Sequence, residues 1–128
     1  MSRLVVLVPT DFSNGAMRAL KRVAMLPVGV RSTVHLLHVS DEPGRIKAGE
    51  MEARIERARE RLLAQARAHG RNLRSVTTQV RRGEPWVEII RAARALDATV
   101  VVLGRRGAGV GLGIRHALGV ELQEVVTP

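Results

Sequence analysis

Short apolar runs alternate along this chain with segments in which apolar residues recur at helical spacing. The runs predict strands at residues 3–8, 33–39, 73–80 and 99–103. The helical segments are predicted at residues 14–26, 48–69, 85–96 and 114–125. Because parallel strands need crossover connections and helices supply them, this alternation predicts one α/β domain over residues 1–128, with a doubly wound parallel sheet.

Two of the apolar runs predict where their strands lie in the sheet. Residues 3–8 include an unbroken apolar run, which is typical of a strand covered on both faces and therefore central. Residues 73–80 are more polar, which favours an edge position. Two helix starts are also marked, since Ser13 or Asn14 can cap the first helix and Pro85 can open the third.

Ligands of doubly wound sheets bind beyond the carboxyl ends of the strands, where the winding reverses. Here the segments expected to meet are Pro9–Ser13, after the first strand, and Gly104–Gly113, after the fourth. A glycine loop between a strand and a helix can present backbone N–H groups to phosphate, and Arg105 and Arg106 would add positive charge. Asp11 would then lie across a crevice from the glycine loop.

The glycine spacing matches neither of two common phosphate-binding motifs. A Walker loop requires Lys-Ser/Thr after its second glycine, whereas Val110 follows Gly109. A dinucleotide-binding fingerprint requires a third glycine where this chain has Leu112. On the loop alone, a flexible surface turn is an equal alternative to a phosphate site.

Composition favours a soluble globular protein, because 45% of the residues are hydrophobic and 26% are charged. Cysteine is absent, which excludes disulfides and thiolate metal sites. No apolar run is long enough to cross a membrane, and a cytoplasmic location is expected. The net charge of +9 could attract nucleic acid. However, arginines alternate with glutamates and stacking aromatic residues are scarce, so a solvated surface is favoured over nucleic-acid binding.

Catalytic and metal-binding constellations are missing from the sequence pattern. No nucleophile is paired with a base, so no catalytic activity is expected beyond, at most, slow hydrolysis of a bound nucleotide. His35 and His38 lie at odd spacing on one strand and should face opposite sides of the sheet. They are therefore not expected to share a metal ion, and both are predicted to be structural.

Four motifs, in order along the chain, resemble the universal stress protein family: Val8–Ser13, Leu36–Val39, Gly83–Pro85 and Leu103–Gly107. The resemblance spans essentially the whole chain. It implies a flavodoxin-like sheet with strand order 3-2-1-4-5, and a homodimer joined through its last strand or a larger oligomer. It also implies a stress-response regulatory module, in a family with members that bind ATP and members that do not.

For members that bind ATP, the resemblance implies that an aspartate matching Asp11 contacts adenine, as does the backbone matching Val39. Pro9 and Thr10 belong to the same segment as Asp11. Phosphates and ribose are implied to lie on a G-x-x-G-(nine residues)-G-[ST] loop. The candidates in the first half of that loop are Gly104, Arg105, Arg106, Gly107 and Gly109.

The second half of this loop departs from the family pattern. Ala117-Leu118 stand where Gly-Ser/Thr is expected, and Gly119-Val120 come two positions later without a hydroxyl. Losing one hydrogen bond to a charged phosphate costs about 1.5–3 kcal/mol, or about ten- to a hundredfold in affinity. Two hypotheses stay open: a module that binds ATP or ADP, with Mg²⁺, or a dimeric domain that binds no nucleotide and acts through protein partners.

The family pattern also has one more strand after the last helix. Here the helix predicted over residues 114–125 runs almost to Pro128, so a fifth strand is expected to be absent and the domain to be C-terminally short. The expected order is then 3-2-1-4, with Val100–Leu103 forming an unpaired apolar edge.

Overall fold

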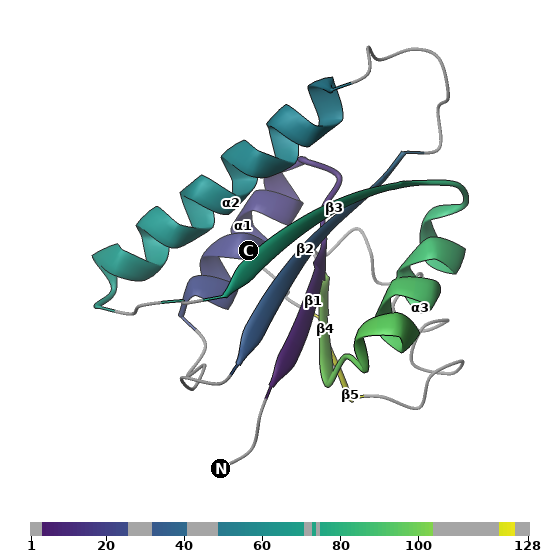
Figure 1. Ribbon diagram of the computed structural model, residues 1–128. Helices are drawn as coiled ribbons and strands as arrows, with labels where there is room; N and C mark the ends of the chain where they lie inside the picture. The colour runs from purple at the N-terminus through teal and green to yellow at the C-terminus, as the bar shows by residue number, and fades with distance from the viewer. Residues whose placement is uncertain are drawn as a thin grey trace.

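Five parallel strands form one sheet in the computed structural model, which describes residues 4–25, 32–40, 49–70, 73, 75–103 and 121–124. The strands are β1 (Val5–Pro9), β2 (Thr33–Ser40), β3 (Val76–Arg82), β4 (Val100–Leu103) and β5 (Glu121–Glu124). The helices described are α1 (Asn14–Ala24), α2 (Glu50–Ala68) and α3 (Pro85–Leu96). The strand order is β3-β2-β1-β4-β5 (Figure 1), which confirms the doubly wound α/β fold and the predicted order 3-2-1-4 of the first four strands.

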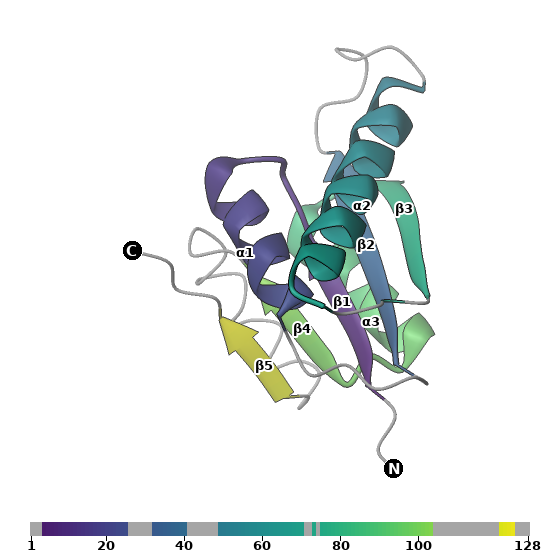
Figure 2. The same ribbon diagram turned by 90° about the vertical axis from the view of Figure 1, so that its left-hand side faces the viewer.

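The sheet separates two hydrophobic layers. Side chains at successive positions of a strand point to opposite faces, so Val6 and Val8 of β1 pack in one layer and Leu7 packs in the other. The first layer includes Leu20 and Val23 of α1 and Ile55 and Leu62 of α2, and the second includes Ile89, Ile90 and Ala93 of α3. Figure 2 shows α1 and α2 on one side of the sheet and α3 on the other. The central strand is therefore buried on both faces, as its apolar run predicts.

A fifth strand is present, contrary to the expectation from the sequence. β5 pairs in parallel with β4, from Val100↔Glu121 to Leu103↔Glu124. The helix predicted over residues 114–125 is thus wrong at 121–124, and its other residues lie outside the described part of the chain. The open N–H and C=O groups along β4 offer Glu121–Glu124 a partner, and this tertiary pairing outweighs the local helical periodicity. β4 is consequently not an edge strand.

Local signals place the starts of two helices as predicted. Ser13 is the N-cap of α1, and its Oγ accepts a hydrogen bond from the Ala16 N–H at 3.2 Å. α3 begins at Pro85, a position where the missing N–H costs no helical hydrogen bond. β3, in contrast, begins later than predicted, because its bounds follow the pairing with β2 from Val34↔Val76 to Ser40↔Arg82.

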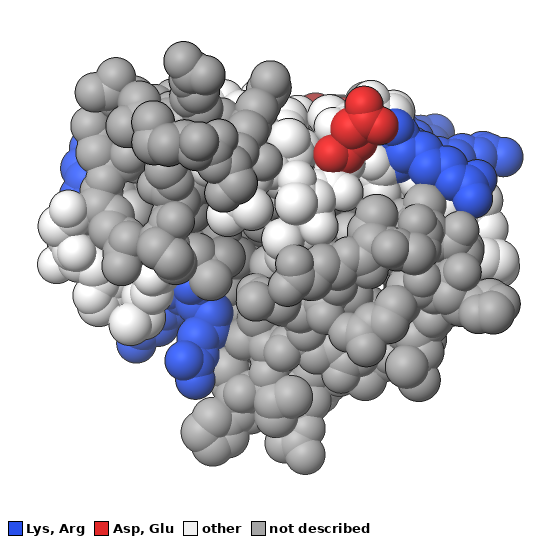
Figure 3. Space-filling model, turned by 90° about the horizontal axis from the view of Figure 1, so that it is seen from below, with Lys and Arg blue, Asp and Glu red and all other residues white. Residues whose placement is uncertain are grey.

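Acidic and basic side chains are paired along α2. Nη2 of Arg54 lies 3.1 Å from Oε1 of Glu50, and Nη1 of Arg59 lies 3.0 Å from Oε1 of Glu56. Seen from below the view of Figure 1, the lysines and arginines of the described residues form separate groups near opposite sides of the molecule (Figure 3). On this face the described positive charges therefore do not form the continuous patch that is typical of nucleic-acid binding.

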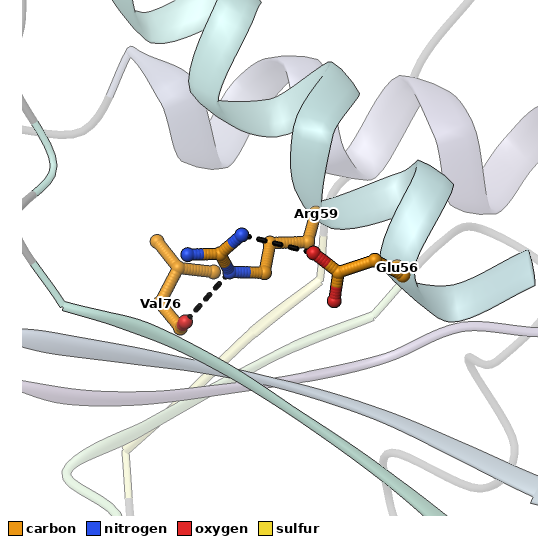
Figure 4. Close-up of polar contacts among 3 residues, drawn as sticks. All are labelled: Glu56, Arg59 and Val76. Carbon is orange, nitrogen blue, oxygen red and sulfur yellow. Dashed lines mark hydrogen bonds and ion pairs between the residues drawn. The ribbon is translucent and has the colours of Figure 1, made fainter. Parts of the chain in front are cut away.

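Arg59 also ties α2 to the edge of the sheet. Its Nε donates a hydrogen bond to the Val76 carbonyl at 3.0 Å while its Nη1 donates to Glu56 (Figure 4). The Val34 N–H donates to the carbonyl of Ser75, so the next carbonyl, that of Val76, points to the open side of β3. An arginine on a helix thus satisfies a backbone acceptor that an edge strand leaves without a partner strand.

The turn between β3 and α3 is built around Gly83 and the buried carboxylate of Glu88. Gly83 has φ +140°, and a Cβ at this position would lie 3.1 Å from Cγ of Glu88. Glu88 accepts a hydrogen bond from Nη1 of Arg91 at 2.9 Å and lies 3.6 Å from Nη1 of Arg81. The glycine is therefore required both by its backbone conformation and by the close approach of Glu88.

We expect Gly83→Ala to lower the free energy of unfolding by about 1–3 kcal/mol, because an L-residue is strained at this φ and its Cβ would crowd Glu88. Gly15→Ala is the matched control, since Gly15 is helical and its nearest non-neighbouring atom would be Ser13 Oγ at 3.9 Å. That control is expected to raise stability by about 0.4–1 kcal/mol. Urea unfolding followed by fluorescence of Trp86, the single tryptophan, measures both. Equal effects of the two substitutions would contradict this account of the turn.

Candidate functional site

The carboxyl ends of β1, β2 and β4 lie together at one end of the sheet. Pro9, the last residue of β1, pairs with Leu37 of β2. Leu7 pairs with Val101, which sets Pro9 level with Leu103, the last residue of β4. The chain therefore leaves β4 at the same end of the sheet at which the Pro9–Ser13 segment begins.

The predicted phosphate-binding residues follow β4, and they lie outside the described part of the chain. They are Gly104, Arg105, Arg106, Gly107, Gly109, Gly119 and Val120. The predicted residues Pro9, Thr10, Asp11 and Val39 are all described. The geometry below therefore concerns the half of the candidate site made by β1, β2 and the start of α1.

Residues Thr10–Ser13, here called the Asp11 turn, are held by hydrogen bonds at each of their positions. The Thr10 N–H donates to the Leu37 carbonyl at 2.8 Å, which continues the pairing of β1 with β2. Thr10 Oγ1 accepts from the Phe12 N–H at 3.1 Å, and Asp11 Oδ1 accepts from the Ser13 N–H at 2.9 Å. These side chains replace the partners that the backbone loses where the strand ends.

The Asp11 turn places a carboxylate at the surface and a helix start beside it. Thr10 is buried, whereas Asp11 is exposed. Ser13 caps α1, and the first turn of α1 contains no acidic residue. The exposed carboxylate can accept hydrogen bonds from a ligand, while the nearby helix N-terminus contributes partial positive charge.

His38 lies beneath the Asp11 turn and contacts it directly. Its Nδ1 is 2.8 Å from the Thr10 carbonyl oxygen, and its ring centroid is 4.6 Å from that of Phe12, with 32° between the planes. Only 8% of His38 is exposed. The sequence predicts a structural role for this histidine but not its contact with the turn. One feature of the sequence indicates where His38 lies. It follows Leu36 by two positions on the same strand, which places both side chains on the face of the sheet that α1 and α2 cover.

His35 lies on the opposite face of β2, as predicted. Its Nδ1 contacts Thr77 Oγ1 on β3, and its Nε2 lies 3.2 Å from Thr33 Oγ1. Among the described residues, no group of three or more His, Cys, Asp or Glu side chains could hold a metal ion. Nor does any helix in the described ranges have the length and hydropathy of a membrane span.

The model of the universal stress protein family matches residues 3–120. The chain belongs to the universal stress protein family. The match includes both the Asp11 turn and the glycine-rich segment after β4, so both candidate halves of the site lie within the family domain. No curated protein sequence matches the chain significantly.

Solved structures of the family share this fold. A universal stress protein in complex with cAMP is 14% identical, with a TM-score of 0.74 and 98% of each chain covered. One from Archaeoglobus fulgidus in complex with dAMP is 20% identical, with a TM-score of 0.67, covering 96% of this chain and 97% of that one. An Arabidopsis thaliana family protein with AMP bound is 18% identical, with a TM-score of 0.60, covering 98% of this chain and 92% of that one. Each likeness shows the fold.

Burial of the His35 imidazole lowers its pKa below the ordinary value of 6.5, because desolvation disfavours the charged ring. The stability gained by keeping His35 neutral is therefore fully present above the unfolded-state pKa and is lost as the pH falls through the lower folded-state pKa. We expect the free energy of unfolding to decrease from about pH 7 to about pH 5, and to decrease less in His35→Gln. NMR titration of wild-type His35 should give a midpoint below 6.5. A midpoint above this value would contradict the assigned cause.

Proposed function

We propose that this universal stress protein is a regulatory module that binds an adenine nucleotide, ATP or ADP, at the carboxyl ends of β1, β2 and β4. The observation that carries the proposal is the Asp11 turn, which holds an exposed carboxylate at the end of the central strand. Support comes from the family, since three relatives with the same fold are described in complex with cAMP, dAMP and AMP.

The chemistry of adenine fits the described half of the site. The exocyclic amine of adenine is a hydrogen-bond donor, and a carboxylate such as that of Asp11 is an acceptor with capacity for more than one bond. The backbone of Val39, at the end of β2 and half-buried, supplies the second contact in this proposal. Because the carboxylate of Asp11 can only accept hydrogen bonds, it would distinguish adenine from bases that lack the exocyclic amine.

The phosphates belong, in this proposal, to the glycine-rich segment after β4. Backbone N–H groups of Gly104, Gly107 and Gly109 would bind phosphate oxygens, and Arg105 and Arg106 would offset their charge. Gly119-Val120 would close the ribose side, although without the hydroxyl of the family pattern. Mg²⁺ would accompany the nucleotide as its counterion. Regulation requires binding alone, so the proposal assigns no catalytic residue.

The proposal includes self-association through β5. This strand forms one edge of the sheet, and the open N–H and C=O groups of an edge strand can pair with a second copy of the chain. A homodimer of this kind would leave the Asp11 turn, at the end of the central strand β1, outside the shared edge.

We expect the wild-type chain to bind ADP or ATP in the presence of Mg²⁺, and Asp11→Asn to bind about tenfold more weakly. Asparagine retains the Oδ1 acceptor for the Ser13 N–H, so the turn is preserved while the carboxylate is lost. Asp97→Asn is the matched control for the loss of one carboxylate. Asp97 is the C-cap of α3 and precedes β4, so it lies at the end of the sheet opposite the Asp11 turn. Isothermal titration calorimetry of the three proteins gives the affinities.

Absence of binding by the wild-type chain at millimolar ATP and ADP would overturn the proposal. It would favour the alternative in which the departure at Ala117-Leu118 has removed the nucleotide and the domain acts through protein contacts. Equal weakening by Asp11→Asn and Asp97→Asn would instead contradict the role of Asp11. Native mass spectrometry of the same preparations reports the number of chains and any bound nucleotide together.

A further inference from the structure

Phe12 adopts a backbone conformation that its side chain disfavours. Its φ is +63°, in the left-handed region where residues other than glycine, asparagine and aspartate are uncommon. It and Asp97 are the non-glycine residues with positive φ in the described part of the chain. A strained residue persists only where its surroundings fix it, and the contacts around Phe12 show what does so.

Contacts on both sides of Phe12 fix its conformation. On the backbone side, its N–H donates to Thr10 Oγ1 at 3.1 Å. On the side-chain side, its ring lies against the imidazole of His38, with the centroids 4.6 Å apart. His38 is anchored in turn within β2, where its neighbours Leu37 and Val39 pair with Gln79 and Arg81 of β3. The strained residue is thus held by a side chain from the rigid sheet.

The hydrogen bond from His38 to Thr10 has only one possible direction. A backbone carbonyl can only accept, so the 2.8 Å contact requires a proton on Nδ1 of His38. In the neutral imidazole this assigns the Nδ1–H tautomer and leaves Nε2 unprotonated. Because Thr10 is the residue before Asp11, the donor acts directly on the peptide segment that carries the carboxylate.

We propose that His38 is a positioning residue of the nucleotide site, which holds the Asp11 turn in its strained, ligand-ready conformation before any ligand is present. This inference rests on the proposed function of Asp11. Nδ1–H of His38 fixes the Thr10 carbonyl, and its ring supports Phe12, so that Asp11 is presented without rearrangement on binding. Removing the donor would relax the turn and weaken binding, although His38 itself touches no ligand.

The test compares two replacements of His38 by ADP titration calorimetry with Mg²⁺, alongside thermal unfolding. His38→Asn keeps a donor, because its amide nitrogen is as many bonds from Cα as Nδ1 is. His38→Leu has similar bulk and no donor. Leu62→Val removes a methylene group from the α1–α2 layer, leaves the hydrogen bonds of the Asp11 turn in place and is the control for a purely structural loss. ¹H–¹⁵N correlation spectra of the wild-type imidazole report its tautomer.

We expect His38→Asn to bind ADP within about threefold of wild type, His38→Leu to bind about tenfold more weakly or worse, and Leu62→Val to bind as wild type does. The spectra should show the Nδ1–H tautomer of His38. Normal binding by His38→Leu, equal losses in both His38 variants, or an Nε2–H tautomer would each overturn the inference while leaving the proposed function intact. Absence of ADP binding by the wild-type chain would instead remove both.

If His38→Leu does not fold, a second variant tests whether His38 positions the Asp11 turn. Phe12→Leu retains an apolar side chain but lacks the ring that lies against His38. With the histidine donor still present, we expect its ADP affinity to fall between those of wild type and Asp11→Asn. Binding equal to that of the wild-type chain would show that the packing of Phe12 on His38 does not position the turn.

Discussion

β1 is buried on both of its faces, and the places of the neighbouring strands and helices follow from this. Val6 and Val8 contact the layer formed by α1 and α2, and Leu7 contacts the layer formed by α3. A strand placed in this way must pair on both edges, and β2 and β4 supply the partners. Backbone pairing of β1 with β2 continues as far as the Thr10 N–H, and beyond it the N–H groups of Phe12 and Ser13 must find partners among side chains. The candidate site is the region where this requirement is met.

The Asp11 turn shows how the end of a buried strand can become a binding surface. Thr10, Asp11 and Ser13 each use a short polar side chain to satisfy a nearby backbone N–H. The same arrangement leaves the carboxylate of Asp11 exposed next to the start of α1, on a turn that follows the buried strand β1. Precision at such a site comes from the sheet beneath it, and His38 is the side chain that connects the two.

Much of the fold could be predicted from the sequence because its signals are local. The unbroken run in Val5–Val8, the cap at Ser13 and Pro85 at the start of α3 each depend on neighbouring residues alone. β5 could not be predicted in this way, because Leu122 lies at helical spacing from Leu118 and its strand exists through pairing with β4. Long-range partners decide such short segments.

The candidate site also contains features that depend on local sequence and features that depend on long-range contacts. The positions of Asp11 and Val39 near the carboxyl ends of β1 and β2 could be predicted, since the apolar pattern marks both strands. Their contacts with adenine are implied by the family resemblance and stay a prediction. The contact of His38 with Thr10 could not be predicted, because it joins β2 to the turn that follows β1 and depends on the register Pro9↔Leu37. Strand parity places His38 on the face of the sheet that α1 and α2 cover, but only the three-dimensional structure shows that its ring contacts the Asp11 turn.

If an adenine nucleotide binds at the Asp11 turn, titration with ADP followed by amide NMR should produce saturable shifts of the amides of Thr10–Ser13 and Val39, at the ends of β1 and β2. The amides of β3 and of the carboxyl-terminal half of α2 should stay in place. Shifts confined to α2 and abolished by salt would contradict nucleotide binding at the Asp11 turn, as would a spectrum that millimolar ADP leaves unchanged.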